Sequence, residues 1–135
     1  FWIVGQQPHP RLARLADRPD ITLTGRVPDV RPFLVGATVC VLPFRMGSGT
    51  RLKVLEALAL GRAVVSTTLG AEGFGLRDGH ELRLADSAAA FAQVVVALLA
   101  DAAQRARLGA QAHAFATANY GWERIVPRLE AVYAP

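Results

Sequence analysis

The chain has 135 residues, of which 52% are hydrophobic, with a single cysteine and a formal net charge of +4 at pH 7. A domain of this length buries about two-thirds of its unfolded surface, so it needs no disulfides, and no apolar run approaches the roughly 20 residues of a membrane helix. The basic residues are scattered and form no stripe, which argues against nucleic acid as a partner. Composition therefore predicts one soluble domain over residues 1–135 in a reducing, cytoplasmic compartment.

Short apolar runs alternate along the chain with segments of helical periodicity. The apolar runs predict strands at Phe1–Gly5, Ile21–Gly25, Thr38–Pro43 and Ala63–Thr67. The periodic segments predict helices at Pro10–Ala16, Val30–Val35, Thr50–Leu60, Ser87–Leu99, Ala102–Ala118 and Trp122–Tyr133. Strands separated by helices are typical of a parallel sheet covered on both faces, so the expected fold is α/β, a Rossmann-like three-layer α/β/α arrangement.

Three expectations concern the two ends of the chain. The chain opens in an apolar strand without an initiator Met, and we expect it to belong to a longer polypeptide, truncated on its N-terminal side. The alanine-rich segment 86–118 is predicted to form two antiparallel amphipathic helices that serve as scaffold. Trp122 and Tyr133 in the last helix are predicted to be core anchors.

Ligands of an open parallel sheet bind outside the carboxyl ends of its strands, so the loop after each strand is a candidate site. We expect four such loops to share one rim: Gln6–Pro10, Arg26–Asp29, Phe44–Gly49 and Thr68–Gly75.

The third of these loops ends in Gly47-Ser48-Gly49-Thr50 and leads into the predicted helix that carries Lys53 and Glu56. That helix is apolar almost all round, so Glu56 is expected to be buried and to need a partner or a ligand. Arg51 and Lys53 place positive charge at the positive end of the helix dipole, where acidic residues are preferred. A bound phosphate would offset this cost, because glycines let the backbone approach closely and free amides point outward.

The cations of this chain are almost always arginine: 14 of the 15 basic residues are arginine and only Lys53 is lysine. A compact ammonium at that position fits an anionic ligand. The alternative is structural, in which the glycine-rich loop caps a core helix and Lys53 and Glu56 form an i,i+3 ion pair.

Other candidate residues carry weaker signals. Cys40 lies in an apolar run and is expected to be a buried thiol rather than a nucleophile. His9 and His80 fall in predicted loops and His113 on a helix, all without ligand spacing, so each is expected to be solvated. The segment 70–75 is glycine-rich, but its spacing is wrong for a dinucleotide fingerprint.

Residues 47–67, Gly-Ser-Gly-Thr-Arg-Leu-Lys-Val-Leu-Glu-Ala-Leu-Ala-Leu-Gly-Arg-Ala-Val-Val-Ser-Thr, resemble the signature of the large retaining glycosyltransferase family with the GT-B fold, called family 4 or group 1. Further similar motifs follow the family's order: Ile3-Val4-Gly5, Leu23-Thr24-Gly25-Arg26-Val27, Gly70-Ala71-Glu72-Gly73 and Tyr120-Gly121-Trp122. The resemblance covers nearly the whole chain and only the carboxyl-terminal, donor-binding half of such an enzyme.

The resemblance implies a role for each site residue. Glu56 would bind the ribose hydroxyls of a sugar nucleotide, and Arg26 and Val27 would border the nucleobase. Ser48 replaces a second glutamate that often contacts the donor sugar in this family, which leaves donor identity open. The implied diphosphate-binding segment comprises Gly47, Ser48, Gly49, Thr50, Arg51 and Leu52, with Lys53 beside it; Gly49 and Thr50 would offer backbone amides.

The implied activity is transfer of a hexosyl group from a nucleotide-diphosphate sugar to an acceptor glycan or lipid-linked sugar, with retention of configuration. No metal ligands and no further cofactor are expected. The implied partner is a missing N-terminal GT-B domain, without which the fragment is expected to be inactive, and the implied location is cytoplasmic, with the inner face of the membrane left open. A sugar-nucleotide epimerase of the same architecture and a non-catalytic nucleotide-binding or interaction module remain as alternatives.

Overall fold

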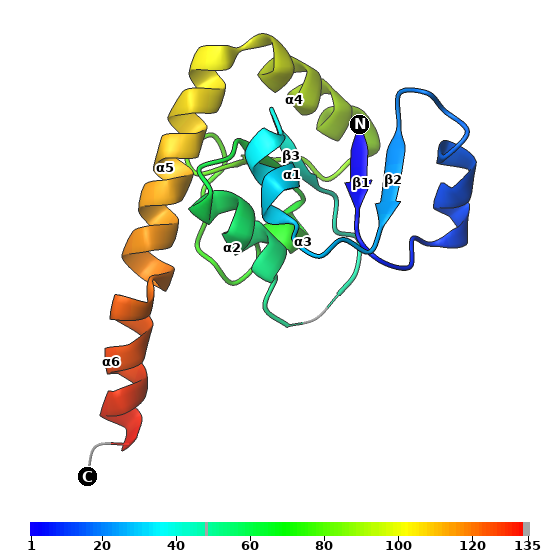
Figure 1. Ribbon diagram of the computed structural model, residues 1–135. Helices are drawn as coiled ribbons and strands as arrows, with labels where there is room; N and C mark the ends of the chain where they lie inside the picture. The colour runs from blue at the N-terminus through cyan, green and yellow to red at the C-terminus, as the bar shows by residue number, and fades with distance from the viewer. Residues whose placement is uncertain (48, 134–135) are drawn as a thin grey trace. The chain divides into compact units, whose positions relative to one another are not determined.

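The computed structural model describes residues 1–47 and 49–133 and divides into two compact units. One unit covers Phe1–Gly36, and the other begins at Ala37. Each unit is an α/β arrangement with parallel strands, as predicted, and each is described by itself (Figure 1).

The first unit contains β1 (Trp2–Val4), the 3-10 helix η1 (Pro10–Leu15), β2 (Thr22–Gly25) and α1 (Arg31–Gly36). The two strands pair in parallel, with a register irregularity after Ile3. The rings of Trp2 and Phe33 lie 5.6 Å apart and connect β1 with α1. The segment predicted as a helix from Pro10 is a single 3-10 helix with no buried residue.

The second unit is built on a parallel sheet of β3 (Cys40–Leu42), β4 (Val64–Ser66) and β5 (Arg83–Leu84) in the order β3-β4-β5. The central strand β4 is fully buried, because its apolar side chains meet neighbours on both faces. Its helices are α2 (Leu52–Ala59), α3 (Thr68–Ala71), α4 (Ala88–Ala100), α5 (Ala102–Tyr120) and α6 (Trp122–Tyr133). Val65, Leu98 and Leu108 form one core cluster that joins β4, α4 and α5.

Two elements of the second unit were not predicted. Helix α3 is a four-residue turn within the predicted loop Thr68–Gly75. Strand β5 has only two residues, and Arg83 within it binds Asp78 Oδ1 through Nε at 3.0 Å. A two-residue strand with a charged member carries no recognisable apolar alternation.

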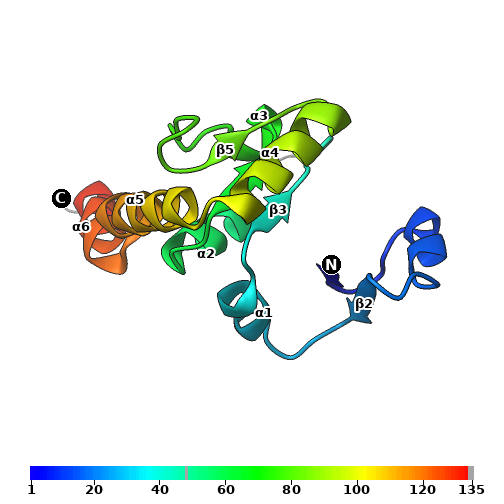
Figure 2. The same ribbon diagram turned by 90° about the horizontal axis from the view of Figure 1, so that it is seen from above.

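The prediction that α4 and α5 are antiparallel is wrong, because the segments Ala88–Ala100 and Ala102–Tyr133 meet at a bend of 104° (Figure 2). Asp101 alone connects them: it ends α4 and caps α5 by accepting a hydrogen bond of 2.8 Å from Gln104 N. A one-residue connection is too short to reverse the chain direction. In the described part of the chain no single helix is both long and apolar enough to span a bilayer; the bent pair meets those criteria by length and composition alone.

The prediction that Trp122 and Tyr133 anchor the core is also wrong. Helix α6 extends from the end of α5 and buries none of its side chains (Figure 1). Trp122 is 75% exposed and Tyr133 is 79% exposed. The apolar side of this amphipathic helix is therefore left largely exposed, which is why its aromatic residues stay outside the core.

Helices α2 and α5 approach each other closely at two glycines. A Cβ atom on Gly109 would collide with the backbone carbonyl of Gly61, and it would lie 3.1 Å from the carbonyl carbon. His113 on the next turn of α5 has its Nδ1 2.7 Å from the carbonyl oxygen of Ala59, at the end of α2. His113 is exposed, as predicted, and in addition connects the two helices through this contact.

Candidate functional site

Helix α2 is anchored to the second unit by one face only. Val54, Ala57 and Leu58 are fully buried, and the helix packs against α5, β3 and β4. The helix begins two residues later than predicted, because Arg51 has ψ of 70° and stands outside the helix as its N-cap. Among the described residues no side chain caps the first turn, where Leu52 N donates to the carbonyl of Thr50 at 3.0 Å and Val54 N to that of Arg51 at 2.9 Å.

The prediction that Glu56 is buried is wrong. Glu56 is exposed, together with Leu52, Lys53 and Ala59, as expected if these four residues share one helix face. The helix is apolar on more than one side, yet only the face of Val54 is covered, which leaves the opposite face to solvent. An apolar composition alone did not distinguish the covered face from the open one.

The predicted alternative of an ion pair between Lys53 and Glu56 is not realised. Among the residues that the structure describes, neither side chain has a hydrogen bond or an ion pair. The only lysine of the chain and a carboxylate therefore stand one helical turn apart on an open surface, directly after the glycine loop. Both can contact a polar ligand without first breaking a protein contact.

The loop before α2 uses two glycines in conformations that other residues rarely adopt. Gly47 has φ of 136° and Gly49 has φ of 82°. Both values lie in the region that glycine tolerates because it lacks a Cβ. Ser48, which was predicted to belong to the donor-binding segment, lies outside the described residues.

The side chain of Arg51 folds over this loop. Nη1 donates to the carbonyl of Gly49 at 3.1 Å and Nη2 donates to the carbonyl of Gly47 at 3.3 Å. The same Nη2 lies 3.5 Å from Oε2 of Glu72, and the Arg51 side chain is 12% exposed. The sequence predicted this charge in the first helical turn, facing a ligand, but in the structure it lies on the loop carbonyls.

Two side chains join the carboxyl ends of β3 and β4. Ser66 Oγ donates to the carbonyl of Leu42 at 3.2 Å, and Thr67 Oγ1 donates to the carbonyl of Phe44 at 2.8 Å. Gly70 N donates back to Thr67 Oγ1 at 3.2 Å. The loops after these two strands therefore start side by side, which confirms this part of the predicted rim.

The other half of the predicted rim belongs to the first unit. Arg26 is exposed and Val27 is partly buried just after β2. Their predicted place beside the nucleobase stays a prediction.

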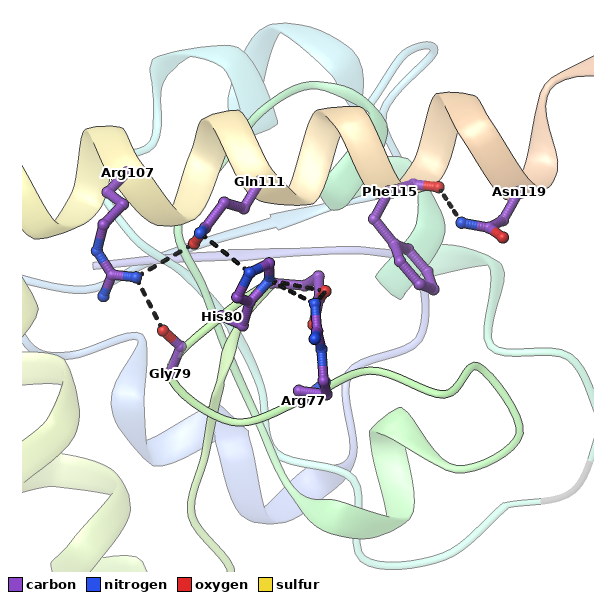
Figure 3. A network of polar contacts seen from close by, with 8 residues as sticks. Arg77, Gly79, His80, Arg107, Gln111, Phe115 and Asn119 are labelled. Atoms are coloured by element: carbon purple, nitrogen blue, oxygen red, sulfur yellow. Dashed lines mark hydrogen bonds and ion pairs between the residues drawn. The ribbon is translucent and has the colours of Figure 1, made fainter.

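A polar network that the sequence did not reveal fixes the loop between α3 and β5 onto α5 (Figure 3). Glu81 is buried, and its carboxylate accepts bonds of 2.9 Å from Arg77 N and 2.7 Å from Arg77 Nη2. His80 Nδ1 lies 2.8 Å from Glu81 Oε1, and His80 Nε2 lies 3.2 Å from Gln111 Nε2. Arg107 donates to the carbonyl of Gly79 at 3.1 Å. His80, predicted to be solvated, is thus half-buried between the loop and α5.

The pKa of Glu81 reflects this surrounding. Burial raises the pKa, but bonds from the Arg77 side chain and backbone and from His80 outweigh it and lower the pKa from 4.5 to about 2. Glu81 is therefore ionised at neutral pH and acts as a structural acceptor. An acidic residue four positions after Arg77 was the signal that could have indicated the pair.

The described residues contain no group of three or more His, Cys, Asp or Glu side chains that could hold a metal ion. Cys40 is buried as predicted, and burial raises the pKa of its thiol.

Comparison with known proteins identifies the family. Residues 1–101 match the family described as Glycosyl transferases group 1, so the chain belongs to this family. An uncharacterized 44.6 kDa protein in the cps region of Klebsiella pneumoniae is 28% identical over 90 residues, which cover 67% of this chain and 23% of that protein.

Solved structures show the same fold. Sucrose-phosphate synthase from Thermosynechococcus elongatus has a TM-score of 0.84 at 24% identity, and the alignment covers 98% of this chain and 37% of that protein. A glycosyltransferase from Rickettsia africae has a TM-score of 0.84 at 14% identity, and the alignment covers 98% of this chain and 38% of that protein. HepE from Anabaena, solved in complex with UDP, has a TM-score of 0.80 at 16% identity, covering 96% of this chain and 40% of its own. The fold is the α/β class of GT-B glycosyltransferases, and the chain spans well under half of each relative.

Proposed function

We propose that this chain is the donor-binding half of a glycosyltransferase that moves a hexosyl group from a nucleotide-diphosphate sugar to an acceptor, with retention of configuration. The observation that carries the proposal is the open face of α2, where Lys53 and Glu56 have no partner among the described residues and directly follow the glycine loop. Membership of the group 1 family and the solved complex of the Anabaena relative with UDP support it.

The start of α2 would bind the diphosphate. The positive end of the helix dipole favours an anion there, and no described side chain competes for this position as a cap. Lys53 adds a compact positive charge one residue into the helix. As the glycosidic bond breaks, negative charge grows on the leaving diphosphate, so groups already aimed at it stabilise the transition state more than the bound donor.

The remaining contacts follow the order of a sugar nucleotide. Glu56 would accept hydrogen bonds from the ribose hydroxyls, a role that suits an exposed carboxylate as well as the buried one predicted from sequence. Gly49 and Thr50 would donate amides to phosphate or donor sugar, Ser48 would contact the sugar, and Arg26 and Val27 would border the base. Gly47, Arg51 and Leu52 complete the binding segment.

The proposed partners lie outside this chain. They are an N-terminal GT-B domain and an acceptor glycan or lipid-linked sugar, in a cytoplasmic enzyme that works without metal or further cofactor. The cps-region relative favours a role in polysaccharide synthesis.

The test is a calorimetric titration of UDP, GDP and ADP into the full-length protein and into Lys53→Ala and Glu56→Gln. Loss of one charged hydrogen-bond partner should weaken binding by about 1.5–3 kcal/mol, roughly 10- to 150-fold. Arg128→Ala and Glu130→Gln on the exposed helix α6 are matched controls and should bind as wild type.

The titration and a transfer assay distinguish the proposed glycosyltransferase from its two alternatives. Unchanged affinity in folded Lys53 and Glu56 variants would remove the proposed roles. Binding without transfer to any glycan, but with interconversion of the donor sugar, would instead indicate an epimerase. Absence of nucleotide binding in the wild type would favour a non-catalytic interaction module.

A further inference from the structure

Arg51 is the most heavily engaged side chain near the proposed donor site. Its guanidinium holds the carbonyls of Gly47 and Gly49 at 3.3 and 3.1 Å and lies 3.5 Å from the carboxylate of Glu72. With 12% of the side chain exposed, little of this cation faces solvent. Its place is therefore between the loop after β3 and the loop after α3, within one unit of the fold.

The contact with Gly49 fixes the direction of the next amide. A peptide group is planar and trans, so the carbonyl of Gly49 and the N–H of Thr50 point in opposite directions. Because Arg51 holds that carbonyl, the Thr50 N–H points away from the guanidinium. This N–H donates to no other described residue. As far as the described residues go, it is available to a ligand acceptor.

The geometry also explains why this role needs arginine. A guanidinium has several donors in a rigid fork and can hold two carbonyls and a carboxylate at once, whereas an ammonium is a single compact charge. Glycine at positions 47 and 49 makes the loop backbone conformationally permissive, since both residues have positive φ. Without the fork, the peptide between Gly49 and Thr50 has no described side-chain contact that fixes its orientation.

The loop is held at its two ends by different residues. At the start, Thr67 Oγ1 binds the carbonyl of Phe44 at 2.8 Å. At the end, Arg51 binds the two glycine carbonyls. Glu72 connects this second clamp to the segment after α3, so the loops that follow β3 and β4 are joined at both ends of the glycine loop.

We propose that Arg51 is a positioning residue for donor binding: its guanidinium orients the Gly49–Thr50 peptide so that the Thr50 amide faces the diphosphate, and Glu72 holds the guanidinium in place. This inference rests on the proposed function. Arg51 itself does not contact the ligand, which differs from the direct contact predicted from the sequence.

The test compares binding of a nucleoside diphosphate with binding of its nucleoside. Arg51→Lys keeps the charge but loses the forked set of donors. In the full-length protein it should lower the affinity for the nucleoside diphosphate that binds the wild type (UDP, GDP or ADP) by about 10-fold. The affinity for uridine, guanosine or adenosine should stay within twofold, because the nucleoside lacks the diphosphate. Glu72→Gln breaks an ion pair whose carboxylate side chain is 68% exposed, and it should weaken diphosphate binding only two- to threefold.

Arg105 offers a matched control elsewhere in the fold. Its Nη1 also binds two backbone carbonyls, those of Leu98 at 2.6 Å and Leu99 at 2.8 Å, at the end of α4. Arg105→Lys should lower thermal stability and leave the ratio of diphosphate to nucleoside affinity unchanged. Hydrogen exchange of the segment 44–54 in the absence of ligand should be faster in Arg51→Lys and unchanged in Arg105→Lys.

Two results would overturn the inference. One is diphosphate affinity within twofold of wild type in folded Arg51→Lys. The other is an equal loss of diphosphate and nucleoside affinity, which a general disturbance of the fold would produce. If the wild type binds no nucleotide, the proposed function fails first; if it binds and Arg51→Lys binds equally well, only the inference fails.

Discussion

Oε1 of Glu81 lies 2.7 Å from Nη2 of Arg77, although the glutamate side chain is 3% exposed and the arginine side chain is 65% exposed. The two residues are four positions apart in a loop, and the Arg77 backbone N–H completes the pair at 2.9 Å. A buried carboxylate is costly unless it is paired and hydrogen-bonded, and here every contact comes from within five residues. The loop before β5 thus supplies its own partners for a buried charge.

This pair predicts how stability depends on pH. The pKa of Glu81 falls from 4.5 to about 2 on folding, so its stabilising contribution is fully present above pH 4.5 and is lost as the pH falls through about 2. The contribution amounts to at most about 3 kcal/mol. Urea unfolding between pH 7 and pH 2.5 should show wild-type stability falling toward that of Glu81→Gln. A constant difference between the two proteins across this range would contradict the assignment.

Gly70 lies in a tight site where a larger side chain should destabilise the fold. A Cβ atom at this position would collide with Ser66 Oγ and would lie 2.7 Å from Phe44 Cδ2. Gly70→Ala should therefore destabilise the protein by about 1–3 kcal/mol, as overpacking of a tight site does. Gly36→Ala is the control, because a Cβ there meets nothing within 4 Å and φ is not positive. Thermal unfolding of both variants measures the difference.

The hydrogen bonds of the Thr67 hydroxyl should contribute to the free energy of unfolding. Its hydroxyl donates to the carbonyl of Phe44 and accepts from the N–H of Gly70, which is itself buried. Thr67→Val keeps the shape but leaves both backbone groups unpaired, which should cost about 1–3 kcal/mol of unfolding free energy. Thr67→Ser retains the hydroxyl and should lose less. A loss in Thr67→Ser as large as that in Thr67→Val would contradict this prediction, because only Thr67→Val removes the hydrogen bonds.

The rate at which the Cys40 thiol is modified should report whether the protein is folded. It is the single cysteine of the chain, it is 6% exposed, and burial raises its thiol pKa. Because the thiolate is the reactive form, a chromogenic disulfide reagent at pH 8 should modify Cys40 slowly in the folded state and rapidly in denaturant. Fast modification without denaturant would place the thiol on an accessible surface.

The sequence predicted the positions of most helices and strands, but it did not predict which of their faces are covered by neighbouring elements. Its apolar runs located β3 and β4 because both are buried strands, while β5 escaped because Arg83 interrupts so short a strand. Helical spacing placed Lys53 and Glu56 on one face of α2 correctly. Which face is covered depends on α5, whose position relative to α2 no local pattern encodes. Glu56 was therefore predicted to be buried, and it is exposed.

The same limit applies to the polar contacts. The pair of His80 and Gln111 joins residues 31 positions apart, so only the fold reveals it. Arg51 was recognised as unusual at a helix start, but its partners Gly47 and Glu72 become visible only when the loop conformations are known. The sequence shows where a charged side chain lies along the chain, but it does not show which groups that side chain contacts.

The close approach of Gly109 to Gly61 has a consequence for the evolution of the family. Neither residue belongs to α2, yet their contact lies where this helix packs against α5. A side chain at position 109 would push the end of α2 outward and move Lys53 and Glu56 with it. We therefore expect aligned homologues to covary at these two positions: where residue 109 is larger than glycine, the turn around residue 61 should differ in length or conformation.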